Sequence, residues 1–368
     1  MVREIIEVKD LQVWFPVRRG FVESLTSAEQ QYVKAVDGVT FSIKEREIFC
    51  LVGESGCGKT TTGKAILRLV EPTGGVVKYG GEGLTTEQMR DASARGVAKK
   101  YLTKAEAEAD LAVGKIDVRR ITKDKMKMLR QKMQIIFQDP YESLNPKQSV
   151  YDIVAEPLVV NNLGANESDR EKRVIKALDD AGLRPPKDFM WRYPHEVSGG
   201  QRQRVGIAGA LVLQPQFLVA DEPVSMLDVS IRSEILKLML DLREKKGLTY
   251  LFITHDLGVA YVFSDRIGIM YLGKIVELGP TEEVIKGPRH PYTKALISVV
   301  PKPDPRMKTE KIILKGERPD PAHIPPGCRF HPRCPNAMEL CKQQEPKPMY
   351  VSQEHWVSCW LEEGEAKQ

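Results

Sequence analysis

The apolar positions of the first fifty residues fall into short runs rather than a helical repeat. These runs are rich in β-branched residues and are bounded by charged or turn-forming residues, which is typical of β-strands. We expect strands at Ile5–Val8, Leu11–Phe15 and Val39–Ile43.

A strand, a glycine-rich loop and a helix then follow one another along the chain. Glu47–Val52 predicts a buried strand that leads directly into glycine, and beyond Gly58 the apolar spacing becomes helical as far as Leu69. This order predicts a parallel α/β unit. Further buried strands are expected at Phe217–Ala220 and Tyr250–Ile253. Ligands of such sheets gather where the strands end.

The middle of the chain is predicted to be helical. Residues 148–205 are expected to form a helical subdomain, with helices at Val150–Leu158 and Glu167–Ala181 and a stop at Gly182. The segment at 80–132 is polar and rich in charge, and we expect it to be mostly helical and exposed. It is either a solvated insertion without a function or an additional partner contact.

Composition excludes several classes of protein. The chain has 368 residues, of which 42% are hydrophobic and 29% charged, which suits two or three globular domains. No apolar run reaches the roughly 18 residues of a membrane span, and the N-terminus has no secretory pattern, so we expect a soluble, cytosolic protein. The net charge is only +5 and no dense basic block occurs, so nucleic acid is not an expected partner.

The spacing of a phosphate-binding loop is present at Gly53-Glu-Ser-Gly-Cys-Gly-Lys59-Thr60. Backbone N–H groups can converge on phosphate oxygens only where side chains do not obstruct them, so such a loop needs glycine where it turns. We expect Lys59 to bind the β- and γ-phosphates and the Thr60 hydroxyl to ligate Mg²⁺. A chance glycine-rich turn would lack the flanking strand and helix. The predicted nucleotide-binding residues are Gly53, Glu54, Ser55, Gly56, Cys57, Gly58, Lys59, Thr60 and Thr61.

Two cysteines lie at or near this loop. Cys50 is expected to be a core residue of the preceding strand. Cys57 lies inside the loop, where the start of the helix is expected to lower the pKa of its thiol and make it sensitive to alkylation.

Two carboxylates follow the strand predicted at Phe217–Ala220. Asp221 can hold Mg²⁺ through water, and Glu222 is placed to orient or deprotonate the attacking water. A solvated acidic turn would explain this pair equally well if the phosphate loop were absent. His255 follows the next strand, and a lone histidine in that position is more often structural than functional.

A second helix start with exposed N–H groups lies at Val197-Ser198-Gly199-Gly200-Gln201. It is another anion-binding helix end, far along the chain from Lys59. One nucleotide does not need two such ends from one chain, so the second is expected to cover a nucleotide held by a partner. The ordered set resembles the ATP-binding cassette (ABC) ATPases, and it comprises the phosphate loop, Gln138, Ser198–Gln201, Asp221-Glu222, Asp228 and His255.

The resemblance implies an α/β fold, in which a P-loop NTPase cassette has a mixed-sheet core, a helical subdomain and a small Cys-rich C-terminal extension. Two cassettes would sandwich ATP between the phosphate loop of one and Ser198, Gly199, Gly200 and Gln201 of the other. Gln138 would contact Mg²⁺ and the attacking water. His255 would hold the γ-phosphate, and Asp228 would couple the two sites.

An aromatic side chain normally stacks on adenine in this family. Phe15 is our first choice for that role and Tyr32 the second, although Phe15 could equally pack in the core. Because Glu222 is present, the resemblance implies a catalytically complete subunit. Val197 and Met226 stand where the family usually has leucine and alanine, and both changes are conservative.

The chain further resembles the oligopeptide/dipeptide importer subfamily of the ABC ATPases. The resemblance rests on Gly287–Thr293, Asp139–Pro146 and the cysteine-rich tail that begins at Pro325. The segment at 80–132 is longer than in that subfamily. We expect a cassette over residues 1–285, an extension with a proline-rich linker over 286–327 and the tail over 328–368.

Four cysteines in the tail are separated by 5, 6 and 17 residues. In a reducing cytosol such a set holds a metal more often than disulfides. Four thiolates suit either Zn²⁺ or an iron–sulfur cluster, but the absence of Cys-x-x-Cys pairs weakens zinc. The resemblance implies a [4Fe–4S] cluster, and free buried thiols are the third alternative. The expected ligands are Cys328, Cys334, Cys341 and Cys359.

The predicted function is ATP hydrolysis that drives import of di- or oligopeptides. The resemblance implies a second ABC ATPase subunit as a paralogous heterodimer partner, two transmembrane permease subunits and an extracellular or periplasmic substrate-binding protein. The chain would lie at the cytoplasmic face of the cell membrane. Import of oligosaccharides by the same machine is one alternative. A soluble ABC ATPase that acts on nucleic acid or ribosomes is the other.

Overall fold

The computed structural model describes residues 3–17, 30–80, 116–119, 121, 123–300 and 310–365. The chain divides into two compact units, each built from several stretches of sequence. The first unit comprises residues 1–6, 43–48 and 78–253, and the second comprises residues 7–42, 49–77 and 254–368. Most of the polar segment predicted at 80–132 lies outside the described residues.

Three parallel strands form the centre of the first unit: β6 (Met133–Ile136), β7 (Phe217–Asp221) and β8 (Thr249–Thr254). Strand β7 pairs with both neighbours, and every residue of β7 and β8 is buried. Strands that are apolar throughout are typical of a parallel sheet covered on both faces. The two buried strands predicted in this region are confirmed.

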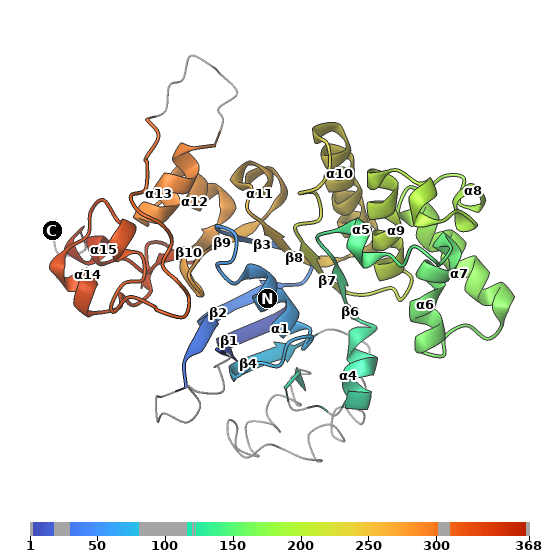
Figure 1. The fold of residues 1–368 in the computed structure, drawn as a ribbon, viewed down its shortest axis with the longest axis horizontal. Helices are drawn as coiled ribbons and strands as arrows, with labels where there is room; N and C mark the ends of the chain where they lie inside the picture. The colour runs from blue at the N-terminus through green and yellow to red at the C-terminus, as the bar shows by residue number, and fades with distance from the viewer. Residues whose placement is uncertain are drawn as a thin grey trace, which may run out of the picture. The chain divides into compact units, whose positions relative to one another are not determined.

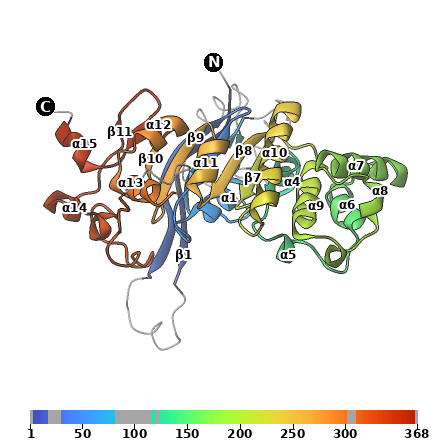
Figure 2. The same cartoon turned by 90° about the horizontal axis from the view of Figure 1, so that it is seen from above.

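Helices make up most of the remaining first unit, and α6 to α9 group together in both views of the chain (Figures 1 and 2). Capping side chains set where they begin, because Ser149 and Asp152 form a capping box at α6 and Asn166 accepts from Asp169 N–H at α7. The two helices predicted here are confirmed to within two residues. The helices of the unit are α4 (Lys123–Arg130), α5 (Pro140–Ser143), α6 (Val150–Val160), α7 (Glu167–Asp180), α8 (Lys187–Met190), α9 (Gly199–Leu211) and α10 (Val229–Lys246).

The N-terminal strands of the second unit are longer than predicted. Strand β1 runs from Glu4 to Pro16 as one element, whereas the sequence suggested two strands. Asp10 adopts a positive φ of 47° inside it, which explains the break in the apolar pattern. Strand β2 (Tyr32–Lys44) lies on one side of β1 and β4 (Gly74–Tyr79) on the other.

A second sheet in this unit joins the phosphate loop to the C-terminal tail. Strand β3 (Ile48–Val52) is parallel to β9 (Arg266–Tyr271), and β9 is antiparallel to β10 (Lys274–Pro280). Strand β12 (Trp356–Val357) pairs with β10, and β11 (Met349–Tyr350) pairs with β12. Parallel and antiparallel pairs therefore occur together, as the predicted mixed sheet requires.

Short helices complete the second unit. Helix α1 ends at Ile66 rather than at Leu69, because Arg68 adopts a positive φ of 51°. In Figure 2, α11, α12 and α13 lie close to β9 and β10. Within the described ranges, no helix is both long and apolar enough to cross a membrane. The helices of the unit are α1 (Lys59–Ile66), α11 (Leu257–Phe263), α12 (Thr281–Lys286), α13 (Pro291–Ser298), α14 (Glu339–Gln343) and α15 (Trp360–Glu365).

Candidate functional site: a phosphate loop and an acidic strand end

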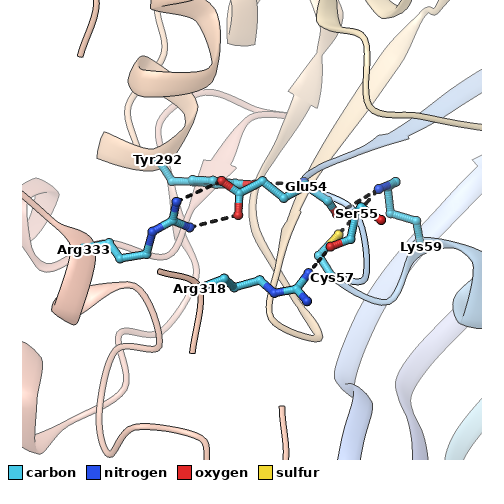
Figure 3. A network of polar contacts seen from close by, with 7 residues as sticks. All are labelled: Glu54, Ser55, Cys57, Lys59, Tyr292, Arg318 and Arg333. Carbon is cyan, nitrogen blue, oxygen red and sulfur yellow. Dashed lines mark hydrogen bonds and ion pairs between the residues drawn. The ribbon is translucent and has the colours of Figure 1, made fainter. Parts of the chain in front are cut away.

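The phosphate loop connects β3 to α1 in the second unit. Lys59, which begins α1, is only 4% exposed. Its Nζ donates to the backbone carbonyl of Gly53 at 2.7 Å. It also donates to the backbone carbonyl of Glu54 at 3.0 Å (Figure 3). The ammonium is therefore held over the loop by backbone acceptors, which is the placement that phosphate binding needs. Thr60 and Thr61 are partly exposed on the first turn of α1.

Glycine is required at two positions of the loop because the backbone of other segments approaches them closely. A Cβ at Gly53 would lie 2.2 Å from the carbonyl oxygen of Met270. A Cβ at Gly58 would lie 2.1 Å from the carbonyl oxygen of Ala35, and Gly58 has a φ of +111°. No side chain can be placed at these two positions without displacing the backbone around them. The glycines that the spacing selected thus have a steric reason.

Both cysteines near the loop are buried. Cys50 is a strand core residue, as predicted. The prediction of a lowered pKa for Cys57 is wrong, because burial raises the pKa of its thiol, and the nearby Lys59 ammonium offsets only part of that rise. Burial also leaves Cys57 poorly placed for alkylation.

The acidic residues lie in the first unit, at the end of β7. Asp221 is 3% exposed, and Glu222 follows it with a positive φ of 45°. The backbone N–H of Glu222 donates to the carbonyl of Ile253 at 2.9 Å, which fixes this turn against the end of β8. Gln138 Nε2 donates to Glu222 Oε2 at 3.2 Å. The structure therefore brings two of the three predicted catalytic side chains together.

Ser198 caps α9 and forms a capping box with Gln201. The backbone N–H of Ser198 donates to Gln201 Oε1 at 3.0 Å, and the N–H of Gln201 donates to Ser198 Oγ at 3.3 Å. Gly200 is buried, and a Cβ there would lie 2.5 Å from Ile231 Cγ2, so glycine allows α9 to approach α10. The cap rigidifies the helix start that the sequence predicts to bind an anion.

The remaining predicted site residues are exposed. Asp228 is the residue before α10 and its side chain makes no capping hydrogen bond. His255 follows β8, in the second unit with the phosphate loop. Phe15 and Tyr32 are each 41% exposed, and the ring of Tyr32 lies 6.2 Å from that of Trp14.

Three residues that sequence reasoning did not select contact the phosphate loop. Tyr292 OH accepts from Glu54 N–H at 3.1 Å, and Arg333 forms a bidentate ion pair with the Glu54 carboxylate at 2.9 and 3.1 Å (Figure 3). Arg318 donates to the carbonyl oxygen of Ser55. No local pattern links these residues to a loop more than 230 positions earlier, although Tyr292 belongs to the segment that carried the subfamily resemblance.

The four tail cysteines are free thiols, of which Cys341 and Cys359 are buried and Cys328 and Cys334 partly exposed. Cys328 N–H donates to the Cys341 carbonyl at 2.8 Å. Burial, together with smaller contributions from the charges of the other three thiols, raises the pKa of Cys359 to about 12, so all four lie in one neighbourhood. The donor chemistry suits a thiolate-bound metal. Yet among the described residues, these four included, no three His, Cys, Asp or Glu side chains are arranged to hold a metal ion. The structure does not confirm the expected four-thiolate centre.

Comparison with known proteins identifies the fold and the family. A model described as "ABC transporter" matches residues 36–225, and one described as "Oligopeptide/dipeptide transporter, C-terminal region" matches residues 276–341. The oligopeptide transport ATP-binding protein AppF of Bacillus subtilis (strain 168) is 42% identical over 97% of each chain. The chain belongs to the ABC transporter family.

Other members of the ABC family agree with this assignment. The dipeptide transport ATP-binding protein DppF of Haemophilus influenzae is 41% identical over 91% of this chain and 90% of that one. A solved ATP-binding cassette dimer bound to ADP and Pi is 28% identical, covers 75% of this chain and 98% of its own, and superposes with a TM-score of 0.56. The predicted cassette fold and ATPase class are confirmed.

Proposed function

We propose that this chain is the ATP-hydrolysing subunit of an ABC importer for di- and oligopeptides. The observation that carries the proposal is the match of residues 276–341 to the C-terminal region of oligopeptide/dipeptide transporters. Relatives with peptide transport in their names match almost the whole chain, which supports the same assignment. The cargo itself is bound by other chains, so this subunit supplies energy rather than specificity.

We propose that the predicted site residues perform the hydrolysis. Lys59 binds the β- and γ-phosphates, Thr60 and Asp221 hold Mg²⁺, and Glu222 activates the attacking water. The Gln138–Glu222 hydrogen bond supports this role for Glu222, because a base must be oriented before it can accept a proton. The further proposed contacts are His255 to the γ-phosphate, Ser198–Gln201 to the nucleotide of the opposite cassette, Asp228 across the dimer, and Phe15, or else Tyr32, to adenine.

The proposed assembly contains three kinds of partner. A second, paralogous cassette completes the two nucleotide sites, two transmembrane permease subunits move the cargo, and an extracellular or periplasmic protein delivers it. The chain lies at the cytoplasmic face of the cell membrane in this assembly. The proposed division of the chain is a cassette over residues 1–285, an extension over 286–327 and a tail over 328–368.

We also propose that Cys328, Cys334, Cys341 and Cys359 hold a [4Fe–4S] cluster, with Zn²⁺ as the alternative. The number and kind of donors and their shared neighbourhood support this proposal. Such a cluster supplies one-electron redox chemistry when it is bound. Anaerobic purification with a visible spectrum and assays for iron, sulfide and zinc tests the assignment. About four irons per chain would support the cluster, and absence of iron would overturn it.

Transport measurements test the main proposal. The full importer is reconstituted with its permease and binding-protein partners, and uptake of labelled di- and oligopeptides is compared with uptake of labelled oligosaccharides. Glu222→Gln is expected to abolish ATP-driven uptake, whereas Glu244→Gln, an exposed carboxylate on α10, serves as the matched control and is expected to leave uptake unchanged. ATP-dependent uptake of oligosaccharide but not peptide would overturn the peptide assignment.

A further inference from the structure

The phosphate loop is held at two consecutive residues, Glu54 and Ser55, by side chains from residues 286–300 and 310–365. These residues, the extension and the tail together, are called the C-terminal extension from here on. Glu54 donates its N–H to Tyr292 OH and pairs through its carboxylate with Arg333, and Ser55 accepts from Arg318 through its carbonyl (Figure 3). Gly56 has no side chain, and a Cβ there would lie 2.9 Å from Arg318 Nη1, so glycine makes room for this guanidinium. All these residues belong to the second unit.

One residue connects the extension to the lysine that binds phosphate. The Glu54 carbonyl accepts from Lys59 Nζ at 3.0 Å, while the N–H and carboxylate of Glu54 are held by Tyr292 and Arg333. The orientation of the Glu54 peptide thus depends on Arg333, and the position of the Lys59 ammonium depends on that peptide. A bidentate guanidinium–carboxylate pair fixes both position and angle, so it can transmit such a constraint.

Burial makes this ion pair more than a surface contact. The Arg333 side chain is 10% exposed and that of Glu54 is 30% exposed. Arg333 also lies 5.9 Å from the ring of Tyr271, which is itself fully buried. An exposed pair would contribute little, because solvent screens it and its side chains remain mobile. A pair packed against a buried ring holds one geometry.

The other end of the loop is held through a second arginine. The Cys57 carbonyl accepts from Gly273 N–H at 2.8 Å, and the neighbouring Leu272 carbonyl accepts from Arg329 at 2.6 Å. Arg329 also pairs with Asp37. Arg329 directly follows Cys328, and Arg333 directly precedes Cys334, so the two arginines that support the loop stand beside two of the tail cysteines.

We infer that the C-terminal extension sets the affinity of the phosphate loop for ATP, with Arg333 acting through Glu54 as a positioning residue for Lys59. The inference rests on the proposed function, because it assumes that this loop binds ATP. It gives the extension a role in the nucleotide site of its own chain. The conformation of the cysteine-rich segment and the binding of the nucleotide are thereby thermodynamically linked. Nucleotide binding is expected to stabilise that conformation by the same free energy by which the conformation favours nucleotide binding.

The test is a double-mutant cycle on the full chain. Dissociation constants for Mg-ATP are measured by displacement of a fluorescent ATP analogue from wild type, Arg333→Gln, Glu54→Gln and the double variant. Each single variant is expected to raise the Kd about tenfold, and the double variant no further, because both changes remove the same pair. Arg333→Lys keeps the positive charge but loses the bidentate geometry of the guanidinium. Its affinity for Mg-ATP is expected to lie between those of Arg333→Gln and the wild type.

The matched control is Arg289→Gln. Arg289 lies in the same unit and pairs with Glu362 of the tail at 3.5 Å, so this variant also breaks a tail ion pair. It is expected to bind ATP with the wild-type Kd. Melting temperatures without nucleotide separate folding from affinity, and the rise in melting temperature on adding ATP gives a second readout of binding.

Two results would overturn the inference while leaving the proposed function intact. One is wild-type affinity in Arg333→Gln, and the other is additive losses in the double variant. If Arg333→Gln does not fold, Glu54→Gln and Arg333→Lys carry the test, and wild-type affinity in both would overturn it. A wild-type chain that binds no ATP would instead overturn the proposed function, and the inference with it.

Discussion

Gln138 Nε2 donates a hydrogen bond to Glu222 Oε2 at 3.2 Å, across 84 residues of sequence. Gln138 follows β6 and Glu222 follows β7, and these strands are parallel neighbours whose carboxyl ends lie at one edge of the sheet. The amide therefore orients the carboxylate that we propose as the base.

Replacement of Glu222 by glutamine is expected to slow ATP hydrolysis without weakening ATP binding. The amide is similar in shape but cannot accept a proton, so ATP hydrolysis should fall by a factor of about 100 or more. ATP affinity should stay close to that of the wild type, because Lys59 and the loop are untouched. Phosphate release and nucleotide binding measured on the same preparation check this. Hydrolysis at the wild-type rate would remove Glu222 from the mechanism.

Substitution of Gly58 by alanine is expected to destroy the phosphate loop. The new Cβ would lie 2.1 Å from the Ala35 carbonyl at a φ of +111°, so the backbone must move. We expect loss of ATP binding and a decrease of about 2 kcal/mol or more in the free energy of unfolding. Gly206→Ala on α9 is the matched control, because nothing lies within 4 Å of its added Cβ, and it should be neutral or slightly stabilising. Equal behaviour of the two variants would contradict the steric argument.

His290 is expected to make the second unit sensitive to acid. Burial, with a smaller contribution from the Lys294 charge, lowers the pKa of this histidine to about 4, because desolvation outweighs the attraction of Glu277. Its Nδ1 accepts from Tyr292 N–H at the start of α13, which requires the neutral ring.

The sign of the effect follows from proton uptake. Between pH 6.5 and 4 the unfolded chain binds a proton at this residue that the folded chain does not, so stability falls as the pH falls. The free energy of unfolding should fall by about 3 kcal/mol over that pH range because of this residue. Denaturant unfolding of wild type and His290→Asn at several pH values measures it. The asparagine retains an acceptor for the helix start, and its stability should depend less on pH.

His355 is expected to anchor the tail to β10. Its Nε2 lies 2.9 Å from Glu277 Oε1, and Glu277 is fully buried, with the N–H groups of Arg289 and His290 as its other donors. His355→Ala would leave this carboxylate with one donor fewer, which should cost about 2 to 3 kcal/mol in the free energy of unfolding.

Urea unfolding with a matched control checks this prediction. His323 pairs with Asp320 at the surface, so His323→Ala should unfold at the wild-type urea concentration. His355→Gln, which restores a donor, should recover part of the loss. A His355→Ala protein as stable as the wild type would show that Glu277 is satisfied without the histidine.

The parts of this structure that the sequence predicted are those fixed by local chemistry. The phosphate loop follows from its spacing, and α6 and α7 follow from capping residues and apolar periodicity. The continuity of β1 was not predicted, because Asp10 interrupts the apolar pattern without ending the strand. The Cys57 pKa was predicted with the wrong sign, because burial depends on the surrounding fold rather than on the loop.

Long-range contacts are the part that no local pattern specifies. Arg333 reaches Glu54 across 279 residues, and nothing in the residues around either one predicts that pairing. The spacing of the four tail cysteines indicated a common centre, and the fold does bring them into one neighbourhood. Spacing alone does not determine how the thiols point, and that decides whether a metal can be held.

The pairing of β12 with β10 has a consequence for truncated forms of this chain. Trp356 and Val357 pair with Leu278 and Glu277, so the tail covers part of the edge of β10, in the sheet that carries β3 and the phosphate loop, and leaves β11 as the outermost strand. A protein that ends before β12 would present unsatisfied backbone donors and acceptors to other chains. Exposed edge strands pair with strands of other chains, so the shortened protein is expected to self-associate rather than to remain monodisperse.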